Sequence, residues 1–232
     1  MQNLDTALII GAAGTIGQAL FAQWRGQYRL MRISRSAQHA DWVSDYSDES
    51  LAGIAGQLVE QGIAPTRIIC CIGELHADSI SPEKSIRDLN AEQLLRAFSI
   101  NSIAPALCIK HFLKLLPRRA PGVMAVLSAK VGSIGDNRLG GWSSYRASKA
   151  ALNMIVRSSA IELARTHKQS ALLAIHPGTT RGAMTAPFER NIPAQRLYSP
   201  AQTAARIATV LDQAGAEHNG SFLNWDGTPL PW

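Results

Sequence analysis

The chain has 232 residues, of which 46% are hydrophobic and 17% are charged, and its formal net charge is +6. No apolar run approaches the roughly 18 residues that a membrane-spanning helix needs, so the sequence argues against a membrane protein. The basic residues are dispersed and have no zinc-finger spacing around them, which argues against a nucleic-acid partner and favours a small anionic ligand.

The start of the chain and its cysteines favour a cytoplasmic location. Asp5 stands just ahead of a short apolar run that no basic segment precedes, unlike a secretory signal. Cys70, Cys71 and Cys108 lie in apolar runs and are predicted to be buried free thiols. The sequence has neither a Cys-x-x-Cys pair nor closely spaced histidines, so we expect no metal site.

Strand and helix patterns alternate along the whole chain. Seven apolar, partly β-branched runs are expected strands, and they begin at Thr6, Tyr28, Asp41, Arg67, Val123, Ala171 and Ser221. Five segments with helical periodicity separate them, namely 16–27, 48–61, 91–116, 143–166 and 200–214. Several strands are apolar at consecutive positions, so helices should cover both faces. We therefore predict an α/β fold: one Rossmann-type, doubly wound domain over residues 1–232 with a seven-stranded, mostly parallel sheet.

Two longer connections, 74–90 and 179–199, follow predicted strands and should emerge at the carboxyl edge of the sheet. Ligands of open α/β sheets bind at that edge. The second connection contains Met184, Pro187 and Phe188, so we predict that it is the substrate loop. The alternative is a mobile surface loop with a few packed side chains.

A glycine-rich turn, GAAGTIG, links the first strand to the first helix. Gly11 would permit the tight turn, Gly14 would let backbone N–H groups approach a diphosphate, and Gly17 would let the helix pack closely. The turn predicts a dinucleotide held by Gly11, Ala13, Gly14, Thr15, Ile16 and Gly17. A merely tight connection is the alternative.

The end of the second strand indicates which dinucleotide binds. Sites that prefer NAD place an acid roughly 20 residues after the glycines, whereas no Asp or Glu occurs between Asp5 and Asp41. Ser34, Arg35 and Ser36 stand there instead, and the guanidinium of Arg35 would suit a 2′-phosphate. The prediction is NADPH over NADH; the alternative is that Arg35 is a solvated surface side chain.

The pentad Tyr145-Arg146-Ala147-Ser148-Lys149 lies near the start of the predicted helix 143–166. Residues four apart share one helix face, so Tyr145 and Lys149 should point together. An ammonium beside the phenol would lower the phenol pKa and make Tyr145 usable as an acid–base catalyst. Taken alone, the pentad would describe a surface pair.

In this order, these motifs resemble the short-chain dehydrogenase/reductase family over essentially the whole chain. The stretch SAKVGSIGDNRLGGWSSYRASKAALN and the ending GTPLPW resemble its C-factor-like and sniffer-type carbonyl reductases. The resemblance implies hydride transfer between a nicotinamide and a carbonyl or alcohol. It implies that Tyr145 donates the proton, that Lys149 holds the nicotinamide ribose, and that Asn101 completes a proton relay; a satisfied buried asparagine is the alternative for Asn101.

The resemblance also implies further cofactor contacts along the strand ends. They are Asp45, Tyr46, Cys71, Ile72, Gly73, Lys149, Pro177, Gly178, Thr179 and Thr180. Asp45 or Ser47 has an alternative role as a helix cap. Gly182 stands where a threonine is usual, and His176 is interpreted as structural.

The serine that polarises the substrate carbonyl in this family is harder to place. Aligning the family's S-S-x-x-G puts Ala129 at that position. Ser128 is the preferred candidate and Ser133 the other, although adjacent strand residues face opposite sides.

The leading hypothesis is an NADPH-dependent carbonyl reductase whose apolar substrate packs on Trp142, Met184 and Phe188. The rival is a nucleotide-binding signalling or sensor protein of the C-factor type with little turnover. The resemblance also implies a homodimer or homotetramer that pairs through the helices carrying Asn101 and Tyr145.

Overall fold

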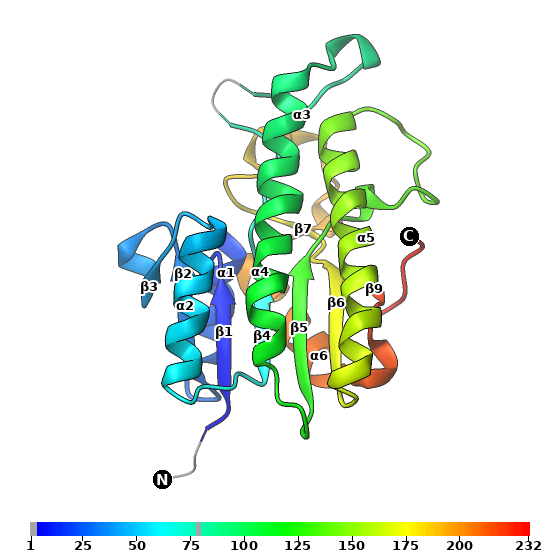
Figure 1. Cartoon of the computed structure of the whole chain (residues 1–232). Helices are drawn as coiled ribbons and strands as arrows, with labels where there is room; N and C mark the ends of the chain where they lie inside the picture. The colour runs from blue at the N-terminus through cyan, green and yellow to red at the C-terminus, as the bar shows by residue number, and fades with distance from the viewer. Residues whose placement is uncertain (1–3, 78–79) are drawn as a thin grey trace.

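A seven-stranded parallel sheet forms the centre of the computed structural model, which describes residues 4–77 and 80–232 (Figure 1). Its strands are β1 (Thr6–Ile10), β2 (Arg29–Ser34), β3 (Trp42–Val43), β4 (Arg67–Cys70), β5 (Gly122–Leu127), β6 (Ser170–His176) and β9 (Phe222–Asn224). The strand order is β3-β2-β1-β4-β5-β6-β9 and every pairing is parallel. The predicted doubly wound, seven-stranded sheet is confirmed.

Helices cover both faces of the sheet, as its consecutive apolar residues predict. Figure 1 shows α2 (Asp48–Glu60), α4 (Ala104–Phe112) and α5 (Ser143–Thr166) in front, with α1 (Thr15–Trp24) and α6 (Pro200–Gln213) packed together behind. Every strand of the sheet except β3 contributes to two cores, because its side chains alternate between the faces. In β1, Leu8 and Ile10 face α2 and α4, while Ala7 and Ile9 face α1 and α6.

The segment 91–116 is helical almost as predicted, but it contains an irregular turn. It comprises α3 (Ala91–Phe98), a π-helical turn (Ser99–Ile103), α4 and a 3₁₀ turn (Leu113–Leu115). The amide of Ala104 donates to the carbonyl of Ser99, five residues back. Such π turns widen a helix and frequently occur at functional sites. This one contains Asn101.

The connection 179–199 holds a short parallel pair that the sequence did not predict. It consists of β7 (Thr179–Thr180) and β8 (Leu197–Tyr198), which lie beyond the carboxyl edge of the main sheet. Two-residue strands are too short for a period-two pattern to reveal them. The 3₁₀ segment Ala186–Asn191 lies between them. None of the helices described is long and apolar enough to cross a membrane.

Candidate active site

The glycine-rich turn has a geometry that side chains larger than hydrogen would disrupt. Gly11 has φ +81°, and a Cβ there would lie 3.1 Å from the backbone of Cys71 and Ile72. A Cβ at Gly17 would lie 2.5 Å from the carbonyl oxygen of Gly11, so α1 packs directly against the turn. These contacts are the ones the sequence predicts for a dinucleotide turn.

The N-terminus of α1 is suited to an anion. Gly14 is its N-cap and is exposed with Thr15, and within the described residues no side chain caps the helix and no acid lies in its first turn. Its first N–H groups therefore remain available to a diphosphate. Nearby, the Ala13 carbonyl accepts from the Gln18 side chain at 2.7 Å, and Ile16 is half-buried against the core. The turn thus fits a dinucleotide cofactor.

Arg35 lies at the end of β2, where the sequence predicts contact with a 2′-phosphate. Its side chain is exposed, and its guanidinium carbon is 6.0 Å from the centre of the Tyr46 ring. The hydroxyl of the buried Ser34 accepts from the amide of Ser36 at 3.0 Å and shapes the turn that presents Arg35. Burial raises the pKa of Tyr46 to about 12, so this phenol stays neutral. The arrangement offers a planar cation beside an aromatic ring.

Asp45 is bonded locally to Ser47, and it is Ser47 that caps the following helix. Its carboxylate accepts from the amide of Ser47 at 2.9 Å, and the Ser47 hydroxyl accepts from Ser50 at the start of α2. The hydrogen bonds from Ser47 hold the pKa of Asp45 below its usual value. The capping role of Ser47 is confirmed, whereas the contact of Asp45 with adenine stays a prediction.

Lys149 lies at the centre of the sheet's carboxyl edge. Its ammonium is buried and donates to the carbonyl of Leu127 at 2.9 Å. A Cβ on Gly73, just after β4, would lie 3.3 Å from that ammonium nitrogen and 3.4 Å from Oδ1 of Asn101. The side chains of Lys149 and Asn101 and the end of β4 therefore meet, as the resemblance implies. Burial lowers the pKa of Lys149 to about 8.

Asn101 anchors the chain that leaves β4. Its Oδ1 accepts from the amide of Glu74 at 2.8 Å, and its Nδ2 donates to the carbonyl of Glu74 at 2.9 Å and to the hydroxyl of Ser148 at 3.3 Å. The side chain is fully buried. The alternative of a satisfied buried asparagine is therefore realised in the structure. The role of Asn101 in a proton relay stays a prediction.

Tyr145 lies in the first turn of α5, and its pKa differs from the sequence prediction. Burial raises that pKa to about 12, whereas we expected Lys149 to lower it. The expectation is wrong for the chain as described, because the ammonium of Lys149 is bound to Leu127 on the strand side of the helix. The spacing in the sequence places Tyr145 and Lys149 on one helix face, but it does not determine where the ammonium of Lys149 lies.

The two candidate serines are already engaged. Ser128 is buried and donates to Oδ1 of Asn153 on α5 at 2.6 Å. The Ser133 hydroxyl donates to the Trp232 carbonyl at 3.3 Å and accepts from the amide of Asp136 at 3.1 Å. Ala129 is an apolar residue at the strand end, between them. This geometry does not favour either serine as the group that polarises a carbonyl, and the role of Ser128 stays a prediction.

Aromatic rings gather beside Tyr145. Trp142 lies 6.4 Å from Tyr145 and 5.4 Å from Phe188, and Phe188 lies 5.8 Å from His76, all between ring centroids. The Nε2 atom of His76 is 3.2 Å and 3.1 Å from the carbonyls of Ala183 and Met184. The connection 179–199 is thus fastened to the chain that leaves β4. Trp142 and Phe188 come together as predicted, while Met184 is exposed.

The turn after β6 is packed tightly. Gly178 has φ +78°, and a Cβ there would lie 3.0 Å from Tyr198 and 3.1 Å from Trp225. Pro177 and Thr179 flank it and are half-buried. The hydroxyls of Thr180 and Thr203 are 2.8 Å apart, so the Thr180 side chain is hydrogen-bonded to α6.

Gly182 and His176 border this turn. Gly182 approaches the glycine-rich turn, because a Cβ there would lie 2.8 Å from the Thr15 hydroxyl. Burial lowers the pKa of His176 to about 4, and the ring is neutral at pH 7. A neutral strand-end histidine agrees with the structural interpretation of this residue.

The cysteines are all free, with one difference from the prediction. Cys70 and Cys108 are buried, but Cys71 is half-buried because it lies where the chain leaves the sheet. In the described part of the chain, no group of three potential ligands is placed to hold a metal ion.

Several polar residues near the site were not found from the sequence. Glu74 forms a two-bond ion pair with Arg96 of α3, at 2.6 Å and 3.0 Å. Glu83 is buried, and Arg146 donates to three backbone carbonyls of the loop before α5. These side chains bind backbone groups or residues distant in sequence, so no spacing pattern in the sequence reveals their contacts. His76 could have been proposed as a site residue, because it lies three residues after Gly73 at the predicted ligand edge.

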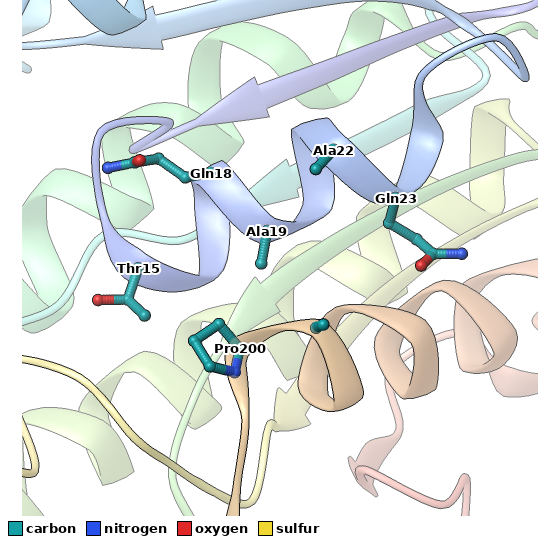
Figure 2. A pocket seen from close by; sticks show the side chains of 7 residues that line it. Thr15, Gln18, Ala19, Ala22, Gln23 and Pro200 are labelled. Atoms are coloured by element: carbon teal, nitrogen blue, oxygen red, sulfur yellow. The ribbon is translucent and has the colours of Figure 1, made fainter.

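A groove also lies between α1 and α6 (Figure 2). Its volume is about 620 Å³. Its lining is uncharged and consists of Thr15, Gln18, Ala19, Ala22, Gln23, Pro200 and Ala201. Only Thr15 belongs to the predicted cofactor site, so the groove flanks the turn on its outer side.

A protein-family model and several characterised proteins are similar to this chain in sequence. A family model described as short chain dehydrogenase matches residues 76–193. The 1-hydroxy-2-glutathionyl-2-methyl-3-butene dehydrogenase of Rhodococcus sp. is 30% identical over 187 residues, which cover 80% of this chain and 76% of that protein. The C-signal protein of Myxococcus xanthus is 32% identical over 64% of this chain and 84% of its own length.

Solved structures show the same fold. The carbonyl reductase Sniffer of D. melanogaster has a TM-score of 0.84 and 20% identity, over 99% of this chain and 100% of that one. An NADPH-bound carbonyl reductase from chicken fatty liver has a TM-score of 0.81 and 20% identity, over 100% of this chain and 96% of that one.

Proposed function

Since the chain belongs to the short-chain dehydrogenase family, we propose that it is an NADPH-dependent reductase of a carbonyl compound. The observation that carries this proposal is the meeting of Lys149, Asn101 and the end of β4 at the carboxyl edge of the sheet, one helical turn from Tyr145. Ligands of doubly wound folds bind at this edge.

NADPH, when bound, supplies the hydride. The exposed backbone at Gly14 and Thr15 would hold its diphosphate, and Arg35 beside Tyr46 would hold the 2′-phosphate. Further contacts are proposed along the strand ends, at Gly11, Ala13, Ile16, Gly17, Ser34, Ser36, Asp45, Cys71, Ile72, Gly73, Pro177, Gly178, Thr179 and Thr180. The NADPH-bound carbonyl reductase of the same fold supports this choice of cofactor.

In the proposed reaction, the Tyr145 hydroxyl donates a proton to the carbonyl oxygen. A phenol whose pKa burial raises to about 12 holds its proton at neutral pH, which suits a donor in the reducing direction. Lys149 would bind the ribose through an ammonium that the strand already positions. Asn101 would hold the π turn and the chain after β4 in place for a proton relay, since its side chain is committed to Glu74.

The substrate proposed is an apolar aldehyde, ketone or quinone. Trp142 and Phe188 form an aromatic wall within reach of Tyr145, and His76 fastens the loop that carries Phe188. Aromatic side chains bind apolar surface and flat rings well. The connection 179–199 would cover the substrate.

Tyr145→Phe tests the proposal. It should lower kcat by about 10²- to 10⁴-fold, because a positioned acid contributes that much. NADPH binding, followed by nucleotide fluorescence, should stay nearly unchanged. A Tyr145→Phe protein with full turnover would refute the assignment.

A second candidate is a nucleotide-binding signalling protein with little turnover. The similarity to C-signal and the apolar residue at Ala129 favour it. The two candidates differ in one experiment: NADPH binding is measured first, and NADPH consumption is then followed over a panel of aldehydes, ketones and quinones. Tight binding with no consumption on any compound would select the signalling protein.

We also propose a homodimer or homotetramer. Exposed apolar side chains on α3, the π turn and α5 support pairing through these helices; they are Leu95, Ile103, Met154 and Ile161. Sedimentation of Met154→Glu and of the wild-type protein would test this, because a charge at the interface should shift the mass toward the monomer. The three free cysteines favour a cytoplasmic setting.

A further inference from the structure

The helix that carries Tyr145 begins without a cap of its own. Its N-cap residue is Trp142, at φ 54°, a backbone conformation in the left-handed region, and its side chain provides no capping hydrogen bond. The first N–H groups of a helix need partners from elsewhere in the protein. For α5 these partners come from a residue 60 positions away in the sequence.

Glu83 supplies them. Its backbone carbonyl accepts from the amide of Trp142 at 2.6 Å, and its carboxylate accepts from the amide of Ser144 at 3.3 Å and from the Ser144 hydroxyl. The side chain is 2% exposed. A carboxylate at a helix N-terminus is stabilised by the helix dipole, which accounts for a buried acid at this place.

The residue on the other side of Tyr145 is tethered as well. The guanidinium of Arg146 donates to the carbonyls of Val131, Gly140 and Gly141 at 3.2, 3.1 and 2.8 Å. Ser144 and Arg146 are thus both held by the loops around the site, with Tyr145 between them. The loop that contains Glu83 is itself fastened to the cofactor edge, where Asn101 binds Glu74.

From these contacts we infer that Glu83 is a positioning residue for Tyr145. The connection 74–90 leads along the chain from β4 to α3, and through Glu83 it contacts the start of α5. The Glu83 carboxylate therefore fixes where the phenol stands relative to the end of β4. A displacement of about 1 Å in a reacting group can cost about 100-fold in rate. The kinetic part of this inference rests on the proposed function, whereas its structural part does not.

The test compares Glu83→Ala, Glu83→Gln and Asn219→Ala. Glutamine keeps an oxygen that can accept from Ser144, so Glu83→Gln should retain most of the kcat that Glu83→Ala loses. Asn219 is the matched control, because it fastens the far part of the same helix through Ala160 at 2.8 Å and is remote from Tyr145. Glu83→Ala should lower kcat about 10- to 100-fold with the KM for NADPH changed less than about twofold, Glu83→Gln should regain most of that rate, and Asn219→Ala should lose thermal stability but keep kcat.

Hydrogen exchange provides a readout that needs no turnover. The amides of residues 142–146 should exchange at least about tenfold faster in Glu83→Ala than in the wild-type protein, and as slowly as in the wild type in Asn219→Ala. Unchanged exchange in Glu83→Ala, or an equal loss of kcat in Asn219→Ala, would overturn the inference. A wild-type protein that consumes no NADPH would refute the proposed function, and exchange would then decide the role of Glu83 alone.

Discussion

Asn101 binds the backbone of Glu74 through both polar atoms of its side-chain amide. Its Oδ1 accepts from the Glu74 amide at 2.8 Å, and its Nδ2 donates to the Glu74 carbonyl at 2.9 Å. This pair joins the π turn between α3 and α4 to the chain that leaves β4. It places the end of β4 beside Lys149, where the cofactor is expected.

Asn101→Ala should therefore damage both stability and turnover. It leaves two backbone groups of Glu74 without their buried partner, which should lower the free energy of unfolding by about 2–3 kcal/mol. Urea unfolding measures that loss, and kcat should fall with it. Asn101→Asp keeps the oxygen but not the donor, so a stability intermediate between alanine and wild type is expected. An alanine variant as stable as the wild type would show that water replaces the amide.

Lys149 should make stability depend on pH in a defined window. Its pKa is about 8 in the folded chain, against 10.5 as the usual value, because burial disfavours the ammonium. Below pH 8 the lysine is charged in both states, so the cost of burying the charge is fully present. Between pH 8 and 10.5 the folded chain releases the proton first, and the cost is removed.

Relative to Lys149→Met, the wild-type protein should thus gain stability as the pH rises from 8 to 10.5, by up to about 3 kcal/mol. Urea unfolding of both proteins at several pH values gives the difference, in which the other groups cancel. Methionine also loses the hydrogen bond to Leu127. That loss shifts the difference between the two proteins at every pH, so only the change of the difference with pH reports the titration of Lys149. A difference that stays flat over the window would contradict a buried ammonium.

Arg35→Ala should change which cofactor is used. Loss of a charge-assisted contact to the 2′-phosphate should lower kcat/KM for NADPH about 10- to 100-fold and leave kcat/KM for NADH nearly unchanged. Arg29→Ala is the control, because Arg29 is exposed at the opposite end of β2. An equal fall with both cofactors would place Arg35 outside the phosphate site.

Ala129→Ser should raise kcat for simple ketones about tenfold or more. One added hydrogen-bond donor to a developing oxyanion accelerates such reactions by at least about that factor. Ser128→Ala serves as the comparison. Its hydroxyl is committed to Asn153, so we expect that variant to change kcat by less than about threefold while losing stability. Steady-state rates with NADPH measure both. A 100-fold loss in Ser128→Ala would instead restore Ser128 as the polarising group.

The sheet and much of the candidate site could be predicted from local sequence. β5 and residues 171–175 of β6 are apolar without interruption, and Gly11 and Gly17 of the first turn stand where only hydrogen fits. Each pattern reports a local requirement. The helix period of 3.6 residues and the strand period of 2 residues can be recognised from neighbouring residues alone. For that reason the order of elements and the positions of Tyr145, Lys149 and Asn101 on them were accessible.

The tertiary structure alone decided which partners these side chains have. The ammonium of Lys149 ends on Leu127, Ser128 turns to Asn153, and Glu83 caps a helix 60 residues away, all through contacts between chain segments distant in sequence. Burial, which raises the pKa of Tyr145 and lowers that of Lys149, is likewise a property of the packed molecule. Local spacing determines which face of a helix a residue occupies, whereas desolvation and hydrogen-bond partners depend on what the rest of the chain places against that face.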